Sequence, residues 1–171
     1  MDDFLGIIVA IIIGLMTMTG INVISITTQE DNIVQEYVDM NTNQFVNTVR
    51  SNGYLSERMY EDYVEELMKT GNVYTIKITH EHTSYVPVYD DNNVFQNAYQ
   101  TSYTKTYEKD IIDYIMTGEN YTFSKNDYFY VDVSSKNITI ANRIRQTFLN
   151  INPTEKSIHS TYGGSIRNEA D

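Results

Sequence analysis

The first part of the chain is a long run of apolar residues without a charge. Residues 4–26 read FLGIIVAIIIGLMTMTGINVISI, and residues 4–16 are apolar apart from two glycines. At 1.5 Å per residue, a helix of this length is about 35 Å long, enough to cross a hydrocarbon core of about 30 Å. A cleaved secretory signal would need a basic residue ahead of this run, and Met1-Asp2-Asp3 supplies none. The pattern therefore predicts a membrane-spanning helix, with these side chains facing lipid: Phe4, Leu5, Ile7, Ile8, Val9, Ile11, Ile12, Ile13 and Leu15.

Two stripes along this helix are candidates for packing and assembly. Gly6, Ala10 and Gly14 lie four residues apart, and small residues at this spacing let helices approach closely in lipid. Thr19, Asn22 and Ser25 lie three residues apart in a second, polar stripe. Polar groups in lipid need a bonding neighbour or must reach the interface, so this stripe either faces partner helices or marks the outer membrane boundary. Gly is also common in membrane helices generally, and this ordinary interpretation of the first stripe stays open.

The helical pattern continues beyond the apolar run. No Pro or Gly interrupts residues 21–52. We therefore predict one continuous helix from about residue 3 to residue 51, apolar all round in its first half and amphipathic in its second, and about 70 Å long. The alternative is two helices, separated at the β-branched run of residues 25–28. Apolar residues recur at three- and four-residue steps on the predicted face, which consists of Ile33, Val34, Tyr37, Val38, Met40, Phe45, Val46 and Val49.

Behind this helix, which we place at residues 1–52, residues 53–171 alternate between short strand and helix patterns. We expect an α+β head domain with a small antiparallel sheet. Ser56 is placed to cap the first helix of this domain. The expected helices are 57–69, 109–116 and 137–149. The expected strands are 73–80, 84–89, 94–107 in a hairpin, 121–123, 128–133 and 156–162, with Asp90-Asp91-Asn92-Asn93 as a turn and Gly163-Gly164 as the end of the last strand.

Composition and charge exclude several classes of function. The chain has 12 Lys and Arg against 23 Asp and Glu, a net charge of −11, and no Cys. A disulfide framework and a cysteine zinc site are therefore impossible. Nucleic-acid binding is not expected, because phosphate binding requires clustered Lys and Arg. No base precedes Arg50, so the positive-inside rule gives no orientation, and the Cys-free remainder, rich in Tyr, Thr and Asn, fits a domain outside the cytoplasm.

Candidate catalytic chemistry is thin. His80 and His82 are two residues apart, so on a strand both side chains point to one face. With His159 as a third imidazole they would form a metal site, but zinc sites usually show clearer spacing, and a solvated strand end is the simpler interpretation. The acids of predicted helix 57–69 are explained by a wet helix face, and residues 90–93 by a turn rather than a cation loop. We therefore expect no catalytic residue, no metal and no cofactor, and a protein that is not an enzyme.

Tyrosine is unusually frequent in this chain. There are 15 Tyr, but no Trp and only 6 Phe, so some of the tyrosine rings must fill the core. Tyrosine combines a large ring with a polar hydroxyl and is enriched at interfaces. Contact between surface tyrosines and a partner is therefore a hypothesis.

Several short stretches carry a resemblance to a known family. They are Val38-Asp39-Met40, residues 45–50, Gly53-Tyr54-Leu55, residues 67–71, Asp127-Tyr128-Phe129 and the ending at residues 162–168. Together with an uncharged helix that continues as an amphipathic helix into a small α+β domain, they resemble the type IV pilin-like subunits. Within that group the sequence is similar to the TadE-like pseudopilins of tight-adherence systems, and to their relatives encoded with conjugative elements of Gram-positive bacteria.

The resemblance implies a structural subunit that is stored in the membrane and packs its hydrophobic helix into an extracellular filament or a secretion or conjugation apparatus at the bacterial cell surface. The partners it implies are other copies of the chain, the membrane, and pilus or secretion assembly machinery. Many pilins carry Glu as the fifth mature residue, where this chain has Leu5. The alternative function is a single-pass membrane-anchored binding domain outside the cytoplasm that does not polymerise.

Overall fold

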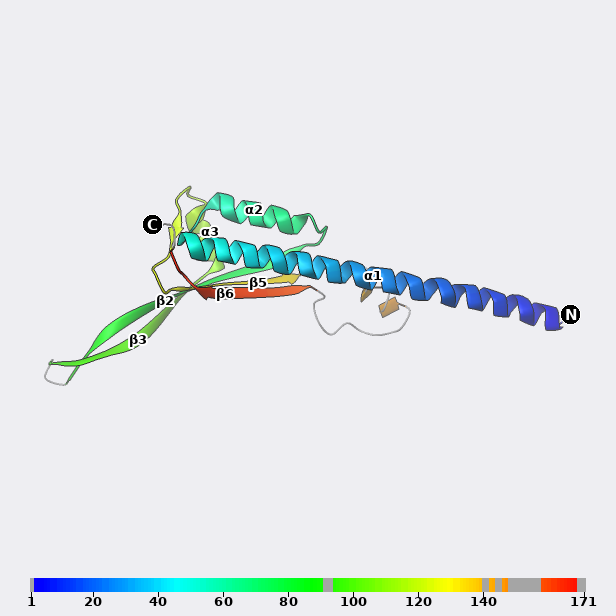
Figure 1. The fold of residues 1–171 in the computed structure, drawn as a ribbon, viewed down its shortest axis with the longest axis horizontal. Helices are drawn as coiled ribbons and strands as arrows, with labels where there is room; N and C mark the ends of the chain where they lie inside the picture. The colour runs from blue at the N-terminus through cyan, green and yellow to red at the C-terminus, as the bar shows by residue number, and fades with distance from the viewer. Residues whose placement is uncertain (1, 91–93, 140–141, 144–145, 148–157, 169–171) are drawn as a thin grey trace.

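A single long helix dominates the molecule. The computed structural model describes residues 2–90, 94–139, 142–143, 146–147 and 158–168, without the side chains of residues 2–3, 17 and 19–24. Helix α1 (Asp2–Asn52) runs for 51 residues, and its N-terminal half projects beyond the rest of the chain (Figure 1). The predicted continuous helix is confirmed, and the alternative with a break at residues 25–28 is wrong. The backbone of residues 21–52 contains no Pro or Gly that would interrupt its hydrogen bonds.

Within the part of the chain that the structure describes, no helix is both long enough and apolar enough to cross a membrane. The side chains at residues 17 and 19–24, which belong to the predicted span of residues 4–26, lie outside that description.

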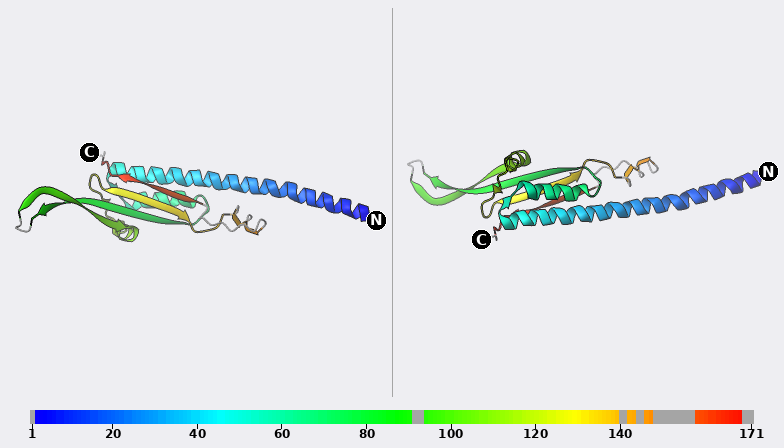
Figure 2. Two further views of the ribbon diagram at one scale, coloured as in Figure 1. Left: turned by 90° about the horizontal axis from the view of Figure 1, so that it is seen from below. Right: turned by 90° about the horizontal axis from the view of Figure 1, so that it is seen from above.

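The head is built on a four-stranded antiparallel sheet with the strand order β3-β2-β5-β6, which confirms the predicted α+β class. Figure 2 shows the sheet with α1 and α2 on one of its faces. A separate pair of short strands, β1 and β4, joins two loops of the head. The elements after α1 are β1 (Tyr54–Leu55), α2 (Glu57–Met68), β2 (Tyr74–Tyr89), β3 (Phe95–Tyr107), α3 (Glu108–Ile115), β4 (Tyr121–Thr122), β5 (Tyr128–Ser135) and β6 (His159–Ser165).

The second half of α1 supplies part of the core. Val38, Phe45, Val46 and Val49 are buried together with Phe129, Val131 and Val133 of β5 and with Leu67 of α2. The predicted apolar face is wrong at two positions, because Ile33 and Met40 are exposed. Thr42 lies in the core instead. The Thr42 hydroxyl donates a hydrogen bond to the Val38 carbonyl at 2.7 Å, and a second hydrogen bond joins it to the Tyr63 hydroxyl at 2.9 Å. Its polar group is therefore satisfied in the core.

The local signals at α2 and α3 are confirmed. Ser56 caps α2, and its Oγ accepts a hydrogen bond from the Met59 amide at 3.3 Å. The backbone then leaves the helix through Gly71, which has a φ of +73°. The predicted helix at 109–116 is observed as α3.

Two predictions for the sheet are wrong. The segments 73–80 and 84–89 are one strand, β2, because β3 continues to pair with it through the polar residues between them. The last strand runs on through Gly163 and Gly164, which were predicted to end it. At Gly163 a Cβ would lie 2.2 Å from Cδ1 of Tyr130, so only glycine lets these strands approach. Residues 91–93 of the predicted turn, and most of the predicted helix 137–149, lie outside the described residues.

The β2–β3 hairpin extends past the rest of the sheet. Strand β5 pairs with β2 only as far as Glu81, whereas β3 pairs with it as far as Tyr89. The distal part of the hairpin therefore forms a two-stranded arm that points away from the N-terminal end of α1 (Figure 1).

Candidate functional site

The projecting half of α1 carries exposed apolar side chains on all sides. The exposed fractions range from 40% to 71% in the set Phe4, Leu5, Ile7, Ile8, Val9, Ile11, Ile12, Ile13, Leu15, Met16 and Met18. The set includes all nine side chains that were predicted to face lipid. An apolar surface of this extent is costly in water, at roughly 25 cal/mol per Å², and such patches mark contact with a protein or a membrane. The described part of the head leaves all of these side chains exposed.

The small residues of this half are not required by the fold of one chain. A Cβ added at Gly6 or at Gly14 would meet nothing within 4 Å. Ala10 lies between them on the same stripe and is exposed. In the predicted polar stripe, the side chains of Thr19 and Asn22 lie outside the described residues, and Ser25 is exposed. The structure therefore leaves the first stripe accessible to another helix.

The direction of the projecting half is set by contacts between α1 and β6. The Gln35 side chain forms two hydrogen bonds with the backbone of His159, donating to its carbonyl at 2.9 Å and accepting from its amide at 3.1 Å. Near the end of the helix, Arg50 Nε donates to the carbonyl of Ser165 at 2.9 Å. Asp31 accepts from the Thr139 hydroxyl at 2.7 Å. These contacts span several turns, so α1 and the head hold a fixed relative orientation.

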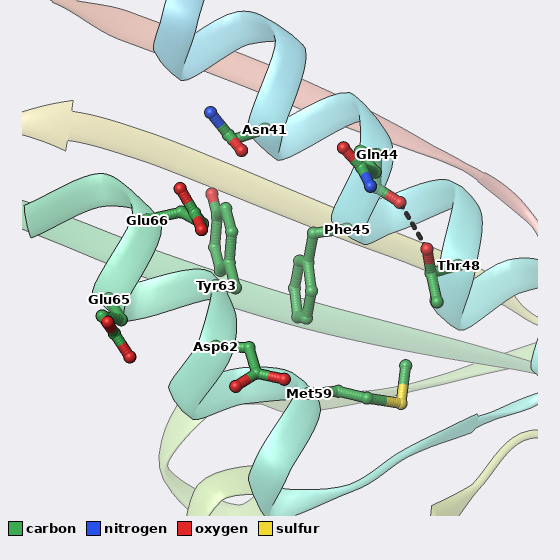
Figure 3. Close-up of a pocket in the computed structure, with 9 residues that line it drawn as sticks. All are labelled: Asn41, Gln44, Phe45, Thr48, Met59, Asp62, Tyr63, Glu65 and Glu66. Atoms are coloured by element: carbon green, nitrogen blue, oxygen red, sulfur yellow. Dashed lines mark hydrogen bonds between the residues drawn. The ribbon is translucent and has the colours of Figure 1, made fainter. Parts of the chain in front are cut away.

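A groove of about 420 Å³ lies between α1 and α2 (Figure 3). The rings of Phe45 and Tyr63 point into it, and Asp62, Glu65 and Glu66 stand along the α2 side. None of the described residues that line it is a His, Cys or Lys, so it offers neither an imidazole base nor a thiol nucleophile. These acids of the predicted wet helix face therefore line one side of the groove between α1 and α2.

A cluster of titratable residues forms where β2 passes the loop before β5. The carboxylate of Asp127 lies between His80 and His82, at 2.9 Å from His80 Nε2 and 2.8 Å from His82 Nδ1. Asp127 and His80 are buried, whereas His82 is partly exposed. Burial raises the pKa of the Asp127 carboxyl, but hydrogen bonds from His80, Ser124 and His82 outweigh it, and its pKa lies below the ordinary value. The group is therefore a carboxylate at neutral pH.

His159, the possible third imidazole of a metal site, does not belong to this cluster. It lies in β6, two strands away from β2, and its Nε2 contacts Asp132 at 2.8 Å. The favoured interpretation of His80 and His82 as a solvated strand end is wrong for His80, because its side chain is buried. Asp127 was not among the candidate ligands, because it lies 45 residues or more from both histidines in the chain and no spacing pattern identifies it.

Six exposed tyrosines share the face of the sheet opposite α1. Alternation along the strands and the observed register place them on the side away from Ile78, His80 and Phe129. This tyrosine face consists of Tyr85, Tyr99, Tyr103, Tyr107, Tyr128 and Tyr130, and each side chain is at least 40% exposed. The rings of Tyr128 and Tyr130 are stacked, with centroids 6.1 Å apart. The tyrosine excess thus supplies a surface as well as part of the core.

No protein-family model matches this chain, and comparisons with curated proteins and with solved structures find no match either. The resemblance to pilin-like subunits therefore stays a prediction from the sequence.

Proposed function

We propose that this protein is a pilin-like or pseudopilin-like structural subunit that assembles with copies of itself through the N-terminal half of α1. The observation that carries the proposal is the projecting apolar helix, whose described side chains are 40% or more exposed from Phe4 to Met18 while the head is packed without them. Burying these side chains against the same helix of other copies would remove their surface from water. In this proposal the assembled form is an extracellular filament, or part of a secretion or conjugation apparatus.

In this proposal, the subunit resides in the membrane before it assembles. Residues 4–26 carry no charge, so lipid is the environment that would cover them before assembly, and the head would then lie outside the cytoplasm. The same apolar side chains serve both states, because helices in lipid and helices in a filament core both present apolar surface to their surroundings.

Two further observations support assembly through this half of α1. Gly6 and Gly14 have open space around them, so neighbouring helices can approach closely there. The bonds of Gln35 and Arg50 to β6 hold the helix at one angle to the head, so every copy presents the same shape to its neighbours. A fixed angle is what a repeating assembly requires.

Deletion of residues 2–25 tests the proposal. The shortened chain keeps every side chain of α1 that is buried among the described residues, so we expect a folded head by circular dichroism that is a soluble monomer by analytical ultracentrifugation. We expect the full chain, purified in detergent and then diluted, to form ordered assemblies visible by electron microscopy. Assembly by the shortened chain would refute the proposal, and so would a full chain that stays monomeric after the detergent is removed.

A second candidate function is a membrane-anchored binding domain, and the tyrosine face is the observation that favours it. Its six exposed rings lie on the sheet face that no helix of the described chain covers in Figure 2. Crosslinking in intact cells separates the two candidates. A ladder of self-crosslinked copies supports the structural subunit, whereas crosslinks from Tyr103 and Tyr107 to a different protein, without a ladder, support the binding domain.

A further inference from the structure

The cluster of His80, His82 and Asp127 is built like a metal site. His80 and His82 sit two residues apart on β2, so both project from the same face of the sheet. Asp127 approaches from the loop between β4 and β5 and points its carboxylate at both rings. One ligand atom from each residue lies within 4.8 Å of the other two. Two imidazole nitrogens and a carboxylate oxygen are therefore close enough together to bind one ion.

The carboxylate is fixed before any ion binds. Asp127 is 1% exposed, and its two oxygens also accept hydrogen bonds from the backbone amides of Ser124 at 2.8 Å and Thr83 at 3.4 Å. A buried negative charge needs a compensating partner, and a cation is the partner that compensates it fully. These two backbone amides hold the carboxylate oxygens of Asp127 in place, so their position does not depend on contacts with flexible side chains.

A hydrogen bond at the ring nitrogen that does not contact Asp127 also orients His80. Its Nδ1 lies 2.8 Å from the Tyr121 hydroxyl, and the ring packs edge-on against Phe123 with centroids 4.9 Å apart. A histidine that binds a metal through one nitrogen usually donates its other N–H to such an outer partner, which holds the ring in place. The tyrosine hydroxyl can accept that proton when Nε2 is the ligand atom.

We propose that His80 Nε2, His82 Nδ1 and an Asp127 carboxylate oxygen bind a divalent transition-metal ion of the Zn²⁺ class. Zinc bonds to imidazole and carboxylate are about 2.0–2.2 Å long, which puts neighbouring ligand atoms of a tetrahedral site about 3.3 Å apart. The present contacts run to different oxygens of Asp127, 2.9 Å from His80 Nε2 to Oδ2 and 2.8 Å from His82 Nδ1 to Oδ1. One ligand atom from each residue nevertheless lies within 4.8 Å of the other two, so a rearrangement of these three side chains within that distance admits the ion. Two imidazoles favour Zn²⁺ over Mg²⁺ or Ca²⁺, which prefer oxygen ligands.

The site has three protein ligands and an open side. The His82 side chain is 44% exposed, so solvent reaches the cluster from that direction and can supply a fourth ligand. The ion would link β2, at the base of the hairpin arm, to the loop before β5. This inference is independent of assembly, because it concerns the opposite end of the head from the projecting half of α1.

Calorimetric titration of the full chain with Zn²⁺, in detergent and after removal of metals with a chelator, tests the inference. We expect about one Zn²⁺ per chain and a melting temperature that rises with added Zn²⁺, while Ca²⁺ has neither effect. His82→Gln is the key variant because its side chain is the most exposed of the three. It should keep the circular dichroism of the wild type and lose more than about 100-fold in affinity, since even an outer-partner change costs about 10–100-fold.

His159→Gln is the matched control. Its ring also lies 2.8 Å from a carboxylate, that of Asp132, but it stands outside the cluster, so Zn²⁺ affinity should not change. Tyr121→Phe should lower the affinity by about 10–100-fold, because it removes only the outer partner of His80. The inference is overturned if the wild type binds no Zn²⁺, or if His82→Gln and His159→Gln bind it equally well.

Discussion

The ring of Phe45 in α1 stacks on the ring of Tyr63 in α2, with the centroids 4.2 Å apart and the planes within 1° of parallel. Phe45 also meets the edge of Phe129 in β5, at a centroid distance of 6.2 Å. Burial raises the pKa of the Tyr63 hydroxyl, so it stays protonated and bonded to Thr42. One aromatic side chain therefore joins the long helix to the second helix and to the sheet.

Phe45→Ala should be among the most costly changes in the head. The side chain is 6% exposed, and removing a buried Phe typically costs about 3–5 kcal/mol through lost burial and the cavity left behind. Urea unfolding of the full chain in detergent, followed by circular dichroism, measures this cost. Ile33→Ala is the control, because Ile33 is on the same helix but 67% exposed and should change stability by less than about 0.5 kcal/mol. Equal costs for the two variants would contradict the structure.

Gly53→Ala should destabilise the head more than Gly71→Ala does. Both glycines have a φ of +73°, so Ala pays the same backbone cost at either position, on the order of 1 kcal/mol. At Gly53 the new Cβ would also lie 2.7 Å from Oδ1 of Asn168, whereas at Gly71 it would meet nothing within 4 Å. The difference between the two unfolding free energies thus measures the contact with Asn168. The difference should become smaller when Gly53→Ala and Gly71→Ala are each made in an Asn168→Ala background, which removes Oδ1 and leaves only the Cβ of residue 168 at 3.3 Å.

The Glu66 carboxylate makes stability depend on pH. Hydrogen bonds from Lys69 and from Tyr37 of α1 lower the pKa of Glu66 below its ordinary value. A carboxyl with a lowered folded-state pKa contributes stability that is present above its unfolded-state pKa and is lost as the pH falls through the folded-state pKa. Glu66→Gln should therefore be less stable than the wild type at pH 7.

The wild type and Glu66→Gln should become equally stable in acid, once the Glu66 carboxyl of the wild type is protonated. Unfolding by urea at a series of pH values measures the difference directly. Glu61→Gln, at an exposed position on the same helix, controls for the general effect of removing a negative charge. A Glu66→Gln difference that grows toward low pH would have the wrong sign and would refute this account.

Gly6→Leu and Gly14→Leu should separate assembly from folding. A Cβ added at either position would meet nothing within 4 Å among the described residues, so the unfolding free energy of the head should not change. Overpacking a close helix contact costs about 1–3 kcal/mol, which lowers association by roughly 5- to 150-fold. Sedimentation of assembled material measures this loss. Ile11→Leu keeps the volume of its side chain and should assemble normally, and normal assembly by both glycine variants would argue against close packing at this stripe.

The sequence by itself determined the elements that depend on local chemistry. The continuity of α1 follows from the absence of Pro and Gly in residues 21–52, and the start of α2 follows from the Ser56 cap, because both effects act within one or two helical turns. The uncharged run at residues 4–26 is likewise evident from the sequence alone. None of these statements depends on residues that are distant in the chain.

The tertiary structure decided everything that depends on strand register. Only pairing with β3 makes β2 continuous through its polar residues, and only that register gathers six tyrosines on one face. Pairing of β2 with β5 brings Asp127, which directly precedes β5, to His80 and His82. Pairing of β5 with β6 places His159 beside Asp132 instead. Contacts of this kind join residues tens of positions apart. They are fixed by backbone hydrogen bonds between strands, which leave no periodic pattern in the sequence.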